Sequence, residues 1–223
     1  MVVPSLQMQS QLIDGCRRLA RKGFLNSPED SFSVRIPGSG DFLLATGLED
    51  WSEVGASDIR TMPFHSADEV IGIHAATYEA RGDAGAVVIL SPLGARLLAR
   101  HDGLLPRLFD EQARHLGRSV NSLPDKERVH RNMLKKALKR GTNALLLGKQ
   151  LLCLGMTCER VLFNAELHEK CAQAYVIAKE SGADVGCIPA LVGYIANRRL
   201  LKNERDAAAS YREGRLPEGI SGY

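Results

Sequence analysis

The sequence predicts a single α/β domain in which helices pack on a mixed β-sheet. Short apolar runs typical of strands alternate with longer segments whose apolar residues recur at helical spacing. No internal repeat or low-complexity linker divides the 223 residues, and a chain of this length can bury one large core. We expect the domain to occupy residues 1–200 and a polar tail, loosely held after Arg198, to occupy residues 201–223.

The first third of the chain predicts a helix followed by a β-hairpin and a third strand. Apolar residues recur at helical spacing over residues 5–25, and the pattern ends near Gly23. The runs SFSVR (31–35) and FLLA (42–45) flank a turn rich in proline and glycine, which is typical of a hairpin. The segment DIRTMP (58–63) predicts the third strand.

A helix and a buried strand are predicted next. Residues 66–81 have a helical pattern, and Ser66 with Glu69 forms a capping-box pair at its start. The run AVVILS (86–91) is apolar throughout, which indicates a strand at the centre of a sheet. A further helix is predicted at 93–100.

The second half predicts two helices around a strand pair. Residues 124–139 have the pattern of a polar amphipathic helix. The segment ALLLGKQLLCL (144–154) predicts two strands around a tight turn at 148–150. A long helix is predicted at 158–180.

Composition and charge exclude several classes of protein. The chain is 44% hydrophobic and 25% charged, which is ordinary for a soluble globular protein. Its net charge of +3 is too balanced to indicate a nucleic-acid or membrane partner. No apolar run approaches the ~20 residues of a membrane span, and the first residues do not resemble a secretory signal. Five scattered cysteines without a CxxC pair indicate reduced thiols and a cytoplasmic location.

From about Leu12 to Tyr175 the order of motifs resembles the class II aldolase/adducin family. Five segments carry the resemblance: SFSVR, ATGLEDWSEVGASDI, IHAATYEARGDAGAVV, LPRLFDEQARHLG and ALLLGKQLLCLG. The resemblance implies α/β/α layers, with helices on both sides of a central mixed, largely antiparallel sheet. It also implies a homo-oligomer, a tetramer in most of the family, with its site between subunits.

The resemblance also locates the positions of the family's metal ligands. In its aldolases three histidines hold a divalent metal, usually zinc, which acts as a Lewis acid on an enediolate. Two of these positions correspond to Ile89 and Ser91, and the third corresponds to Lys149. An aliphatic side chain cannot ligate a metal, and an ammonium group repels one. We therefore expect the zinc site to be lost and no metal cofactor to be bound.

The acid/base residue of the family is displaced as well. The resemblance implies a catalytic glutamate four residues before the helix histidine, and relative to His74 that position is Val70. Glu69 lies one residue away, which rotates a helical side chain by ~100°. Glu69 therefore either acts as an acid/base residue or only caps the helix. His74 is expected to be packed or hydrogen-bonded.

Part of the family's phosphate site is retained. Hydroxyl, guanidinium and backbone groups there can bind an anion, although Arg35 can equally be a structural ion-pair partner. The candidate ligand-binding residues are Ser31, Ser33, Arg35, Thr46, Gly47 and Ser91.

Lys149 leaves three alternatives open. Its ammonium can replace the charge of the metal and bind an oxyanion or carboxylate of a ligand near Ser91. A desolvated lysine can instead form a Schiff base with a carbonyl substrate. The third alternative is that Lys149 extends from the turn into solvent.

Two functional hypotheses follow. The metal, the acid/base residue and much of the phosphate site depart from the family together, which favours a non-catalytic ligand-binding or assembly protein. The alternative is a lyase or epimerase that acts on a small sugar phosphate or carbonyl compound. It uses a metal-free site around Lys149, with Glu69 as a second catalytic residue. A small anionic or carbonyl compound is a possible ligand under the ligand-binding and the enzyme hypotheses.

Overall fold

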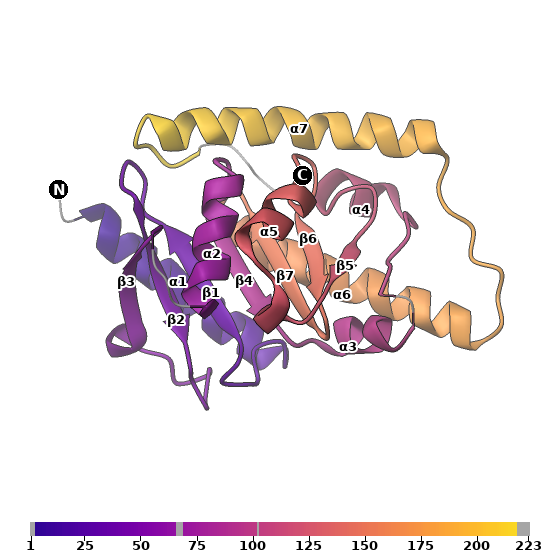
Figure 1. Ribbon diagram of the computed structural model, residues 1–223, viewed down its shortest axis with the longest axis horizontal. Coiled ribbons are helices and arrows are strands. Elements are labelled where there is room, and N and C mark those ends of the chain that lie inside the picture. The colour runs from indigo at the N-terminus through magenta and orange to yellow at the C-terminus, as the bar shows by residue number, and fades with distance from the viewer. Residues whose placement is uncertain (1–2, 66–68, 102, 218–223) are drawn as a thin grey trace.

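The computed structural model describes residues 3–65, 69–101 and 103–217. These residues form one seven-stranded sheet with the strand order β3-β2-β1-β4-β7-β6-β5 (Figure 1). The predicted strand AVVILS is β4, at the centre of this order. The strands are β1 (Ser31–Arg35), β2 (Asp41–Thr46), β3 (Ile59–Pro63), β4 (Ala86–Leu90), β5 (Asn121–Leu123), β6 (Ala144–Leu147) and β7 (Gln150–Gly155).

Neighbouring strands are antiparallel except for β5 and β6, which are parallel. The predicted mixed, largely antiparallel sheet is therefore confirmed. The helices are α1 (Val3–Arg21), α2 (Glu69–Ala80), α3 (Leu93–Arg100), α4 (Asp110–His115), α5 (Arg131–Ala137), α6 (Cys158–Glu180) and α7 (Ala190–Arg212), with 3₁₀ turns η1 (Ala56–Asp58) and η2 (Lys126–Arg128).

Each face of the sheet carries its own hydrophobic core. Side chains alternate between the faces along a strand, so Val88 of β4 packs with α1, α3 and α6, while Ile89 packs with α2 and α5. The helices therefore form layers on both sides of the sheet (Figure 1). Burial on both faces explains why β4 is apolar throughout.

Most of the predicted elements are confirmed, but the helix predicted at 124–139 is wrong. Its first part is the turn η2, and only Arg131–Ala137 is α-helical. Leu123 ends strand β5 because the residue before a proline, here Pro124, prefers extended backbone. His130 is also extended and begins α5 as its N-cap. The capping-box pair predicted at the start of α2 falls partly on Ser66, which lies outside the described residues.

The prediction of a loose tail after Arg198 is also wrong. Residues 199–212 belong to α7, which crosses the edge of the sheet (yellow in Figure 1). Its buried stripe mixes small and polar residues with a single large aliphatic one, which is why a hydrophobic pattern did not reveal it. The stripe consists of Gly193, Asn197, Leu200, Glu204, Ala207 and Tyr211. The domain boundary at residue 200 stays a prediction.

Buried polar contacts anchor α7 to the sheet. Both carboxylate oxygens of Glu204 accept the backbone N–H of Gly141, at 3.1 and 2.9 Å. Arg81 donates to Glu204 at 2.7 Å and forms two hydrogen bonds with Asp83. The Tyr211 hydroxyl donates to the carbonyl of Met156 at 2.9 Å. These contacts fix α7 where β1 and β7 end and β4 begins.

The cysteines are free thiols, and four of the five are buried, as expected for small hydrophobic core residues. The exception is Cys187, which is exposed. None of the helices in the described residues combines the length and apolar character that a membrane span requires.

Candidate functional site

Three neighbouring strands have their termini at the end of the sheet opposite α7. Strand β1 begins at Ser31, β4 ends at Leu90 and β7 begins at Gln150. The antiparallel register aligns Ser31 with Ile89 of β4, and Ile89 with Leu152 of β7. The residues that flank these ends are therefore close in space although they are about 60 positions apart in sequence.

Asp30, Ser91 and Gln150 form a hydrogen-bonded group here, which we call the strand-end cluster. The Ser91 hydroxyl donates to Oδ1 of Asp30 at 2.9 Å. Nε2 of Gln150 lies 3.3 Å from Oγ of Ser91 and 3.5 Å from Oδ1 of Asp30. Oδ2 of Asp30 accepts the backbone N–H groups of Asn26 and Ser27, at 2.9 and 3.0 Å. Both carboxylate oxygens are thus hydrogen-bonded.

The electrostatics of the cluster centre on the carboxylate. Burial raises the pKa of Asp30, and the hydrogen bonds from Asn26, Ser27, Ser91 and Gln150 oppose that rise. Asp30 is fully buried and Gln150 nearly so, while Ser91 is half-buried. Ser91 is therefore the member of the cluster that a ligand reaches most readily.

The side chains at the three expected metal-ligand positions do not fit a metal held by imidazoles. Ile89 is a buried core residue, and the Ser91 hydroxyl is engaged with Asp30. Lys149 carries an ammonium group. Within the described ranges, no three His, Cys, Asp or Glu side chains are grouped so that they could hold a metal ion.

Lys149 lies in the two-residue turn between β6 and β7. Gly148 precedes it with φ +56°, the conformation that favours glycine at the first position of such a hairpin turn. Lys149 is exposed, and the side chain that reaches Ser91 from this region is that of Gln150. Exposure agrees with the solvent alternative, while its roles in anion binding and Schiff-base chemistry stay predictions.

Ser31 and Ser33 both contact His74. Oγ of Ser31 lies 2.8 Å from Nε2, and Oγ of Ser33 lies 2.7 Å from Nδ1. Ser33 also contacts the Tyr78 hydroxyl at 2.8 Å. Burial lowers the pKa of His74 to about 3, so the ring is neutral. The expectation of a hydrogen-bonded His74 is confirmed, and ligand binding by the two serines stays a prediction.

Arg35 lies at the far end of β1, away from the strand-end cluster. Its guanidinium donates to the carbonyls of Gly82 and Tyr78, at 2.8 and 2.7 Å. It also lies over the rings of Phe64, Tyr78 and Tyr211, 5.1–5.3 Å from their centroids. These contacts join β1 to α2 and α7, and the structure does not bring Arg35 to Ser91.

Thr46 also lies close to the cluster. It pairs with Ser31 across the hairpin, and its hydroxyl donates to the backbone carbonyl of Asp30 at 3.4 Å. Gly47 follows it in an exposed turn with φ +75°. Glu69 is the first residue of α2, and its side chain lies outside those that the structure describes. The structure therefore brings together Ser91 and Thr46.

Sequence reasoning missed Asp30 and Gln150 as site residues. Each directly adjoins a strand terminus, and that position is readable from the sequence. Their meeting, however, depends on the pairing of β1, β4 and β7, and strand register between distant segments is not encoded in a local pattern.

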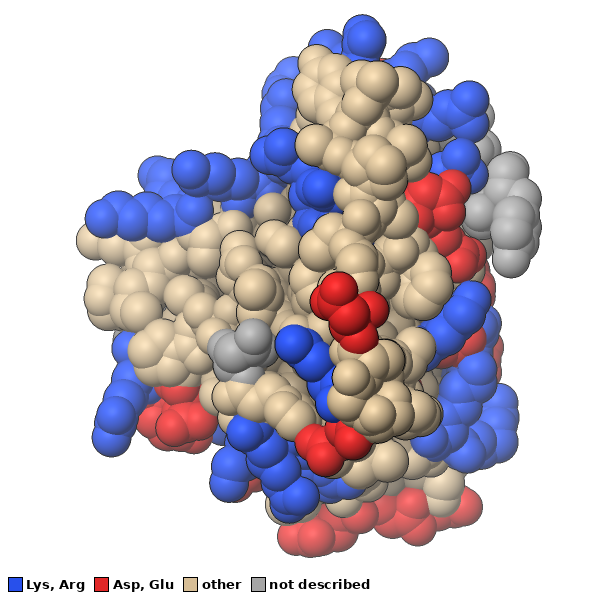
Figure 2. Space-filling view, turned by 90° about the vertical axis from the view of Figure 1, so that its right-hand side faces the viewer, with Lys and Arg blue, Asp and Glu red and all other residues tan. Residues whose placement is uncertain are grey.

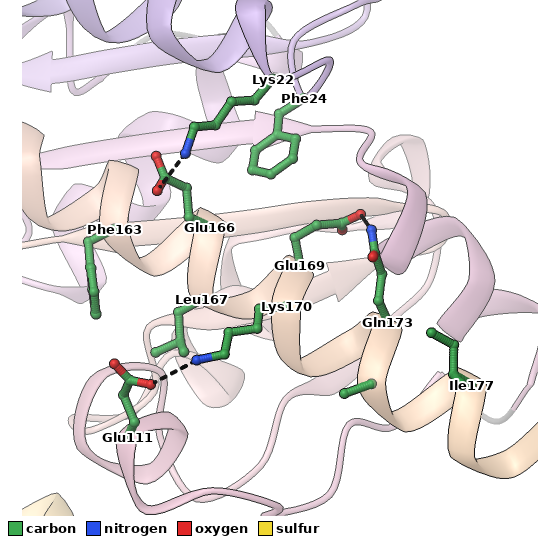
Figure 3. A pocket seen from close by; sticks show the side chains of 11 residues that line it. Lys22, Phe24, Glu111, Phe163, Glu166, Leu167, Glu169, Lys170, Gln173 and Ile177 are labelled. Atoms are coloured by element: carbon green, nitrogen blue, oxygen red, sulfur yellow. Dashed lines mark hydrogen bonds and ion pairs between the residues drawn. The ribbon is translucent and has the colours of Figure 1, made fainter.

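A separate groove of about 690 Å³ runs along α6 (Figure 3). Lys22 pairs with Glu166 at 2.8 Å, and Lys170 pairs with Glu111 at 3.5 Å. Glu169 accepts the backbone N–H of Gly94 and the side-chain amide of Gln173. The charged groups that line this groove therefore already have partners, and none of the predicted site residues lines it.

Comparison with known proteins agrees with this fold. Residues 10–176 match the Class II Aldolase and Adducin N-terminal domain family. No curated protein sequence matches the chain significantly.

Similar solved structures support the same fold. One is an L-fuculose 1-phosphate aldolase, with 19% identity, a TM-score of 0.75, and coverage of 86% of this chain and 95% of that chain. An aldolase II superfamily protein from Pseudomonas syringae has 20% identity, a TM-score of 0.72 and 98% coverage of both chains. YgbL from Klebsiella pneumoniae, described as a putative aldolase/epimerase/decarboxylase, has 16% identity, a TM-score of 0.74, and coverage of 86% and 98%.

Proposed function

The chain belongs to the class II aldolase and adducin family, and from that premise we propose that it has lost the family's metal-dependent lyase activity and acts as a ligand-binding or assembly protein. The observation that supports this proposal is the strand-end cluster. The Ser91 hydroxyl and the Gln150 amide are directed at the Asp30 carboxylate where the resemblance implies imidazole ligands.

Metal-assisted aldol chemistry needs a cation that stabilises the developing enediolate, together with an open coordination position. Ile89 offers no lone pair, and the ammonium of Lys149 disfavours a second cation nearby. In the strand-end cluster the polar groups satisfy one another, so a metal would first have to break the hydrogen bond between Ser91 and Asp30.

The proposed ligand is a small anionic or carbonyl compound at the rim of the cluster. Lys149 offers a positive charge there, and the hydroxyl groups of Ser91 and Thr46 would turn away from Asp30 to donate to the ligand. The similar L-fuculose 1-phosphate aldolase acts, by its name, on a phosphorylated sugar, and we propose this chemical class for the ligand. We also propose that the protein forms a homo-oligomer and is located in the cytoplasm.

An aldol-cleavage assay tests the loss of activity. Purified protein is incubated with sugar 1-phosphates, first with added zinc and then with a chelator. We expect no release of aldehyde above the protein-free rate in either condition, because the side chains at the strand-end cluster do not form a set that binds zinc, the Lewis acid of the reaction. Turnover that requires zinc and disappears with the chelator would refute the proposal.

A metal-free lyase centred on Lys149 is the second candidate. Schiff-base lysines are activated by desolvation, whereas Lys149 is exposed. We expect borohydride, added with a small aldehyde or ketone, to trap no more adduct at Lys149 than at Lys136, an exposed lysine of α5. Mass spectrometry of peptides measures both. Preferential labelling at Lys149, abolished by Lys149→Ala, would favour the enzyme instead.

A further inference from the structure

A small cleft lies between α4 and α7, away from the strand-end cluster. Its volume is about 220 Å³, and it is lined by Asp110, Arg114, Val192, Ile195, Ala196 and Arg199. We propose that this cleft binds a small monoanion with a short apolar chain, such as a short-chain carboxylate. The inference does not depend on the function proposed above, because the two sites share no residue.

In the part of the chain that the structure describes, the two arginines of the cleft have no carboxylate partner. Nε of Arg114 is buried without a hydrogen bond. Neither Arg114 nor Arg199 takes part in any ion pair that joins side chains in the described ranges, although Asp110 lines the same cleft. Because no carboxylate in these ranges neutralises either guanidinium, both can offer charge-assisted N–H donors to an anionic ligand in the cleft.

The charge of the lining fits a ligand with one negative charge. Arg114 and Arg199 carry two positive charges against the single carboxylate of Asp110, so one positive charge is uncompensated. A guanidinium presents paired N–H donors that match the two oxygens of a carboxylate. The cleft therefore has the electrostatics of a carboxylate site.

The rest of the lining is apolar and comes from α7. Val192 and Ile195 expose 43% and 57% of their surface, beside Ala196. The side of the molecule on which α7 begins has an uncharged ridge near its top, with Lys and Arg side chains on both flanks and acidic side chains lower on the right (Figure 2). Apolar walls with a few converging polar groups are typical of small-molecule sites. A short hydrocarbon chain would remove these side chains from water.

The volume limits the length of that chain. One water molecule occupies ~30 Å³ of liquid, so the cleft accommodates about seven heavy atoms. Pentanoate has this size, whereas acetate fills only about half of the space. We expect affinity to rise from acetate to pentanoate and to level off at hexanoate.

Calorimetric titration at constant ionic strength tests the proposal, with acetate, pentanoate, hexanoate and inorganic phosphate as ligands. The variants are Arg199→Gln and its neighbour Arg198→Gln, which is exposed on the same helix but does not line the cleft. We expect pentanoate to bind saturably to the wild type. Arg199→Gln should weaken binding about tenfold or more, since it removes a charge-assisted pair, whereas Arg198→Gln should leave it unchanged.

A third variant, Ile195→Ser, tests the apolar wall. It should remove the advantage of pentanoate over acetate and leave acetate binding unchanged. The proposal is overturned if the wild type binds pentanoate without saturation, if phosphate binds as tightly as pentanoate, or if the two arginine variants lose affinity equally. Circular dichroism of each variant confirms that it is folded.

Discussion

Replacing Arg81 with methionine is expected to destabilise the protein by about 3–5 kcal/mol, the cost of leaving a buried ion pair without one partner. Arg81 is 2% exposed and pairs with both Asp83 and Glu204. Without it, two carboxylates remain buried without a compensating charge. Because Glu204 belongs to α7 and Asp83 precedes β4, the substitution should also loosen α7 from the sheet. Urea denaturation measures the free energy of unfolding.

Arg205→Met is the matched control, since this exposed arginine lies on the same helix as Glu204. Its effect should stay within about 0.5 kcal/mol, as is usual for surface positions. Hydrogen exchange of the α7 amides should be faster in Arg81→Met and unchanged in the control. If the two variants unfold at the same urea concentration, the buried ion pairs do not hold α7 in place.

The second large effect is a loss of stability in acid that arises mainly from two fully buried histidines. His115 adds to it, because burial and the charges of Arg160 and Arg114 lower its pKa to about 4. His74 and His168 are fully buried, and burial lowers the pKa of each from 6.5 to about 3. Below pH 6.5 the unfolded chain binds protons at these sites and the folded chain does not. The contribution of these histidines to the free energy of unfolding is therefore fully present above pH 6.5. It falls as the pH drops toward 3, by up to about 1.4 kcal/mol per pH unit for each histidine.

His74 and His168 differ in their hydrogen-bond partners. Substitution by methionine is therefore expected to change stability in opposite directions at the two positions. Neither ring nitrogen of His168 has a hydrogen-bond partner among the described residues, so His168→Met should raise stability near neutral pH and reduce the acid sensitivity. His74→Met should lower stability, because Ser31 and Ser33 lose the ring nitrogens that they contact. Urea denaturation at about pH 7 and about pH 5 measures both effects. An unchanged acid slope in His168→Met would contradict the linkage.

Local pattern was sufficient for most of the fold. Strand β4 is apolar throughout because both of its faces are covered, and this predicted its central position. The helix predicted at 158–180 is α6 with the same bounds. The resemblance to a family supplied the layer order, which is a property of the whole chain and not of any one segment.

Helix α7 was missed for a physical reason. Its buried positions recur at heptad-like spacing, from Gly193 to Tyr211, but they include Asn197 and Glu204 in place of large apolar residues. The buried carboxylate of Glu204 is tolerated in this stripe because Arg81 and the backbone N–H of Gly141 donate hydrogen bonds to it. A hydrophobic pattern cannot reveal a helix that docks through buried polar contacts.

The candidate site was predicted in part. The resemblance identified Ser91 and Thr46, which lie at one edge of the sheet. It also identified Lys149, whose exposure depends on the conformation of a two-residue turn. Asp30 and Gln150 were missed because only the register of three strands brings them to Ser91.

We propose that this member of the class II aldolase and adducin family does not hold the family's metal. The amount of zinc bound per chain, measured after equilibrium dialysis against a zinc buffer, tests the claim most directly. We predict far less than one zinc per chain, because Ile89, Ser91 and Lys149 do not form a ligand set. One tightly bound zinc per chain, released when Ser91 is changed to alanine, would contradict the account.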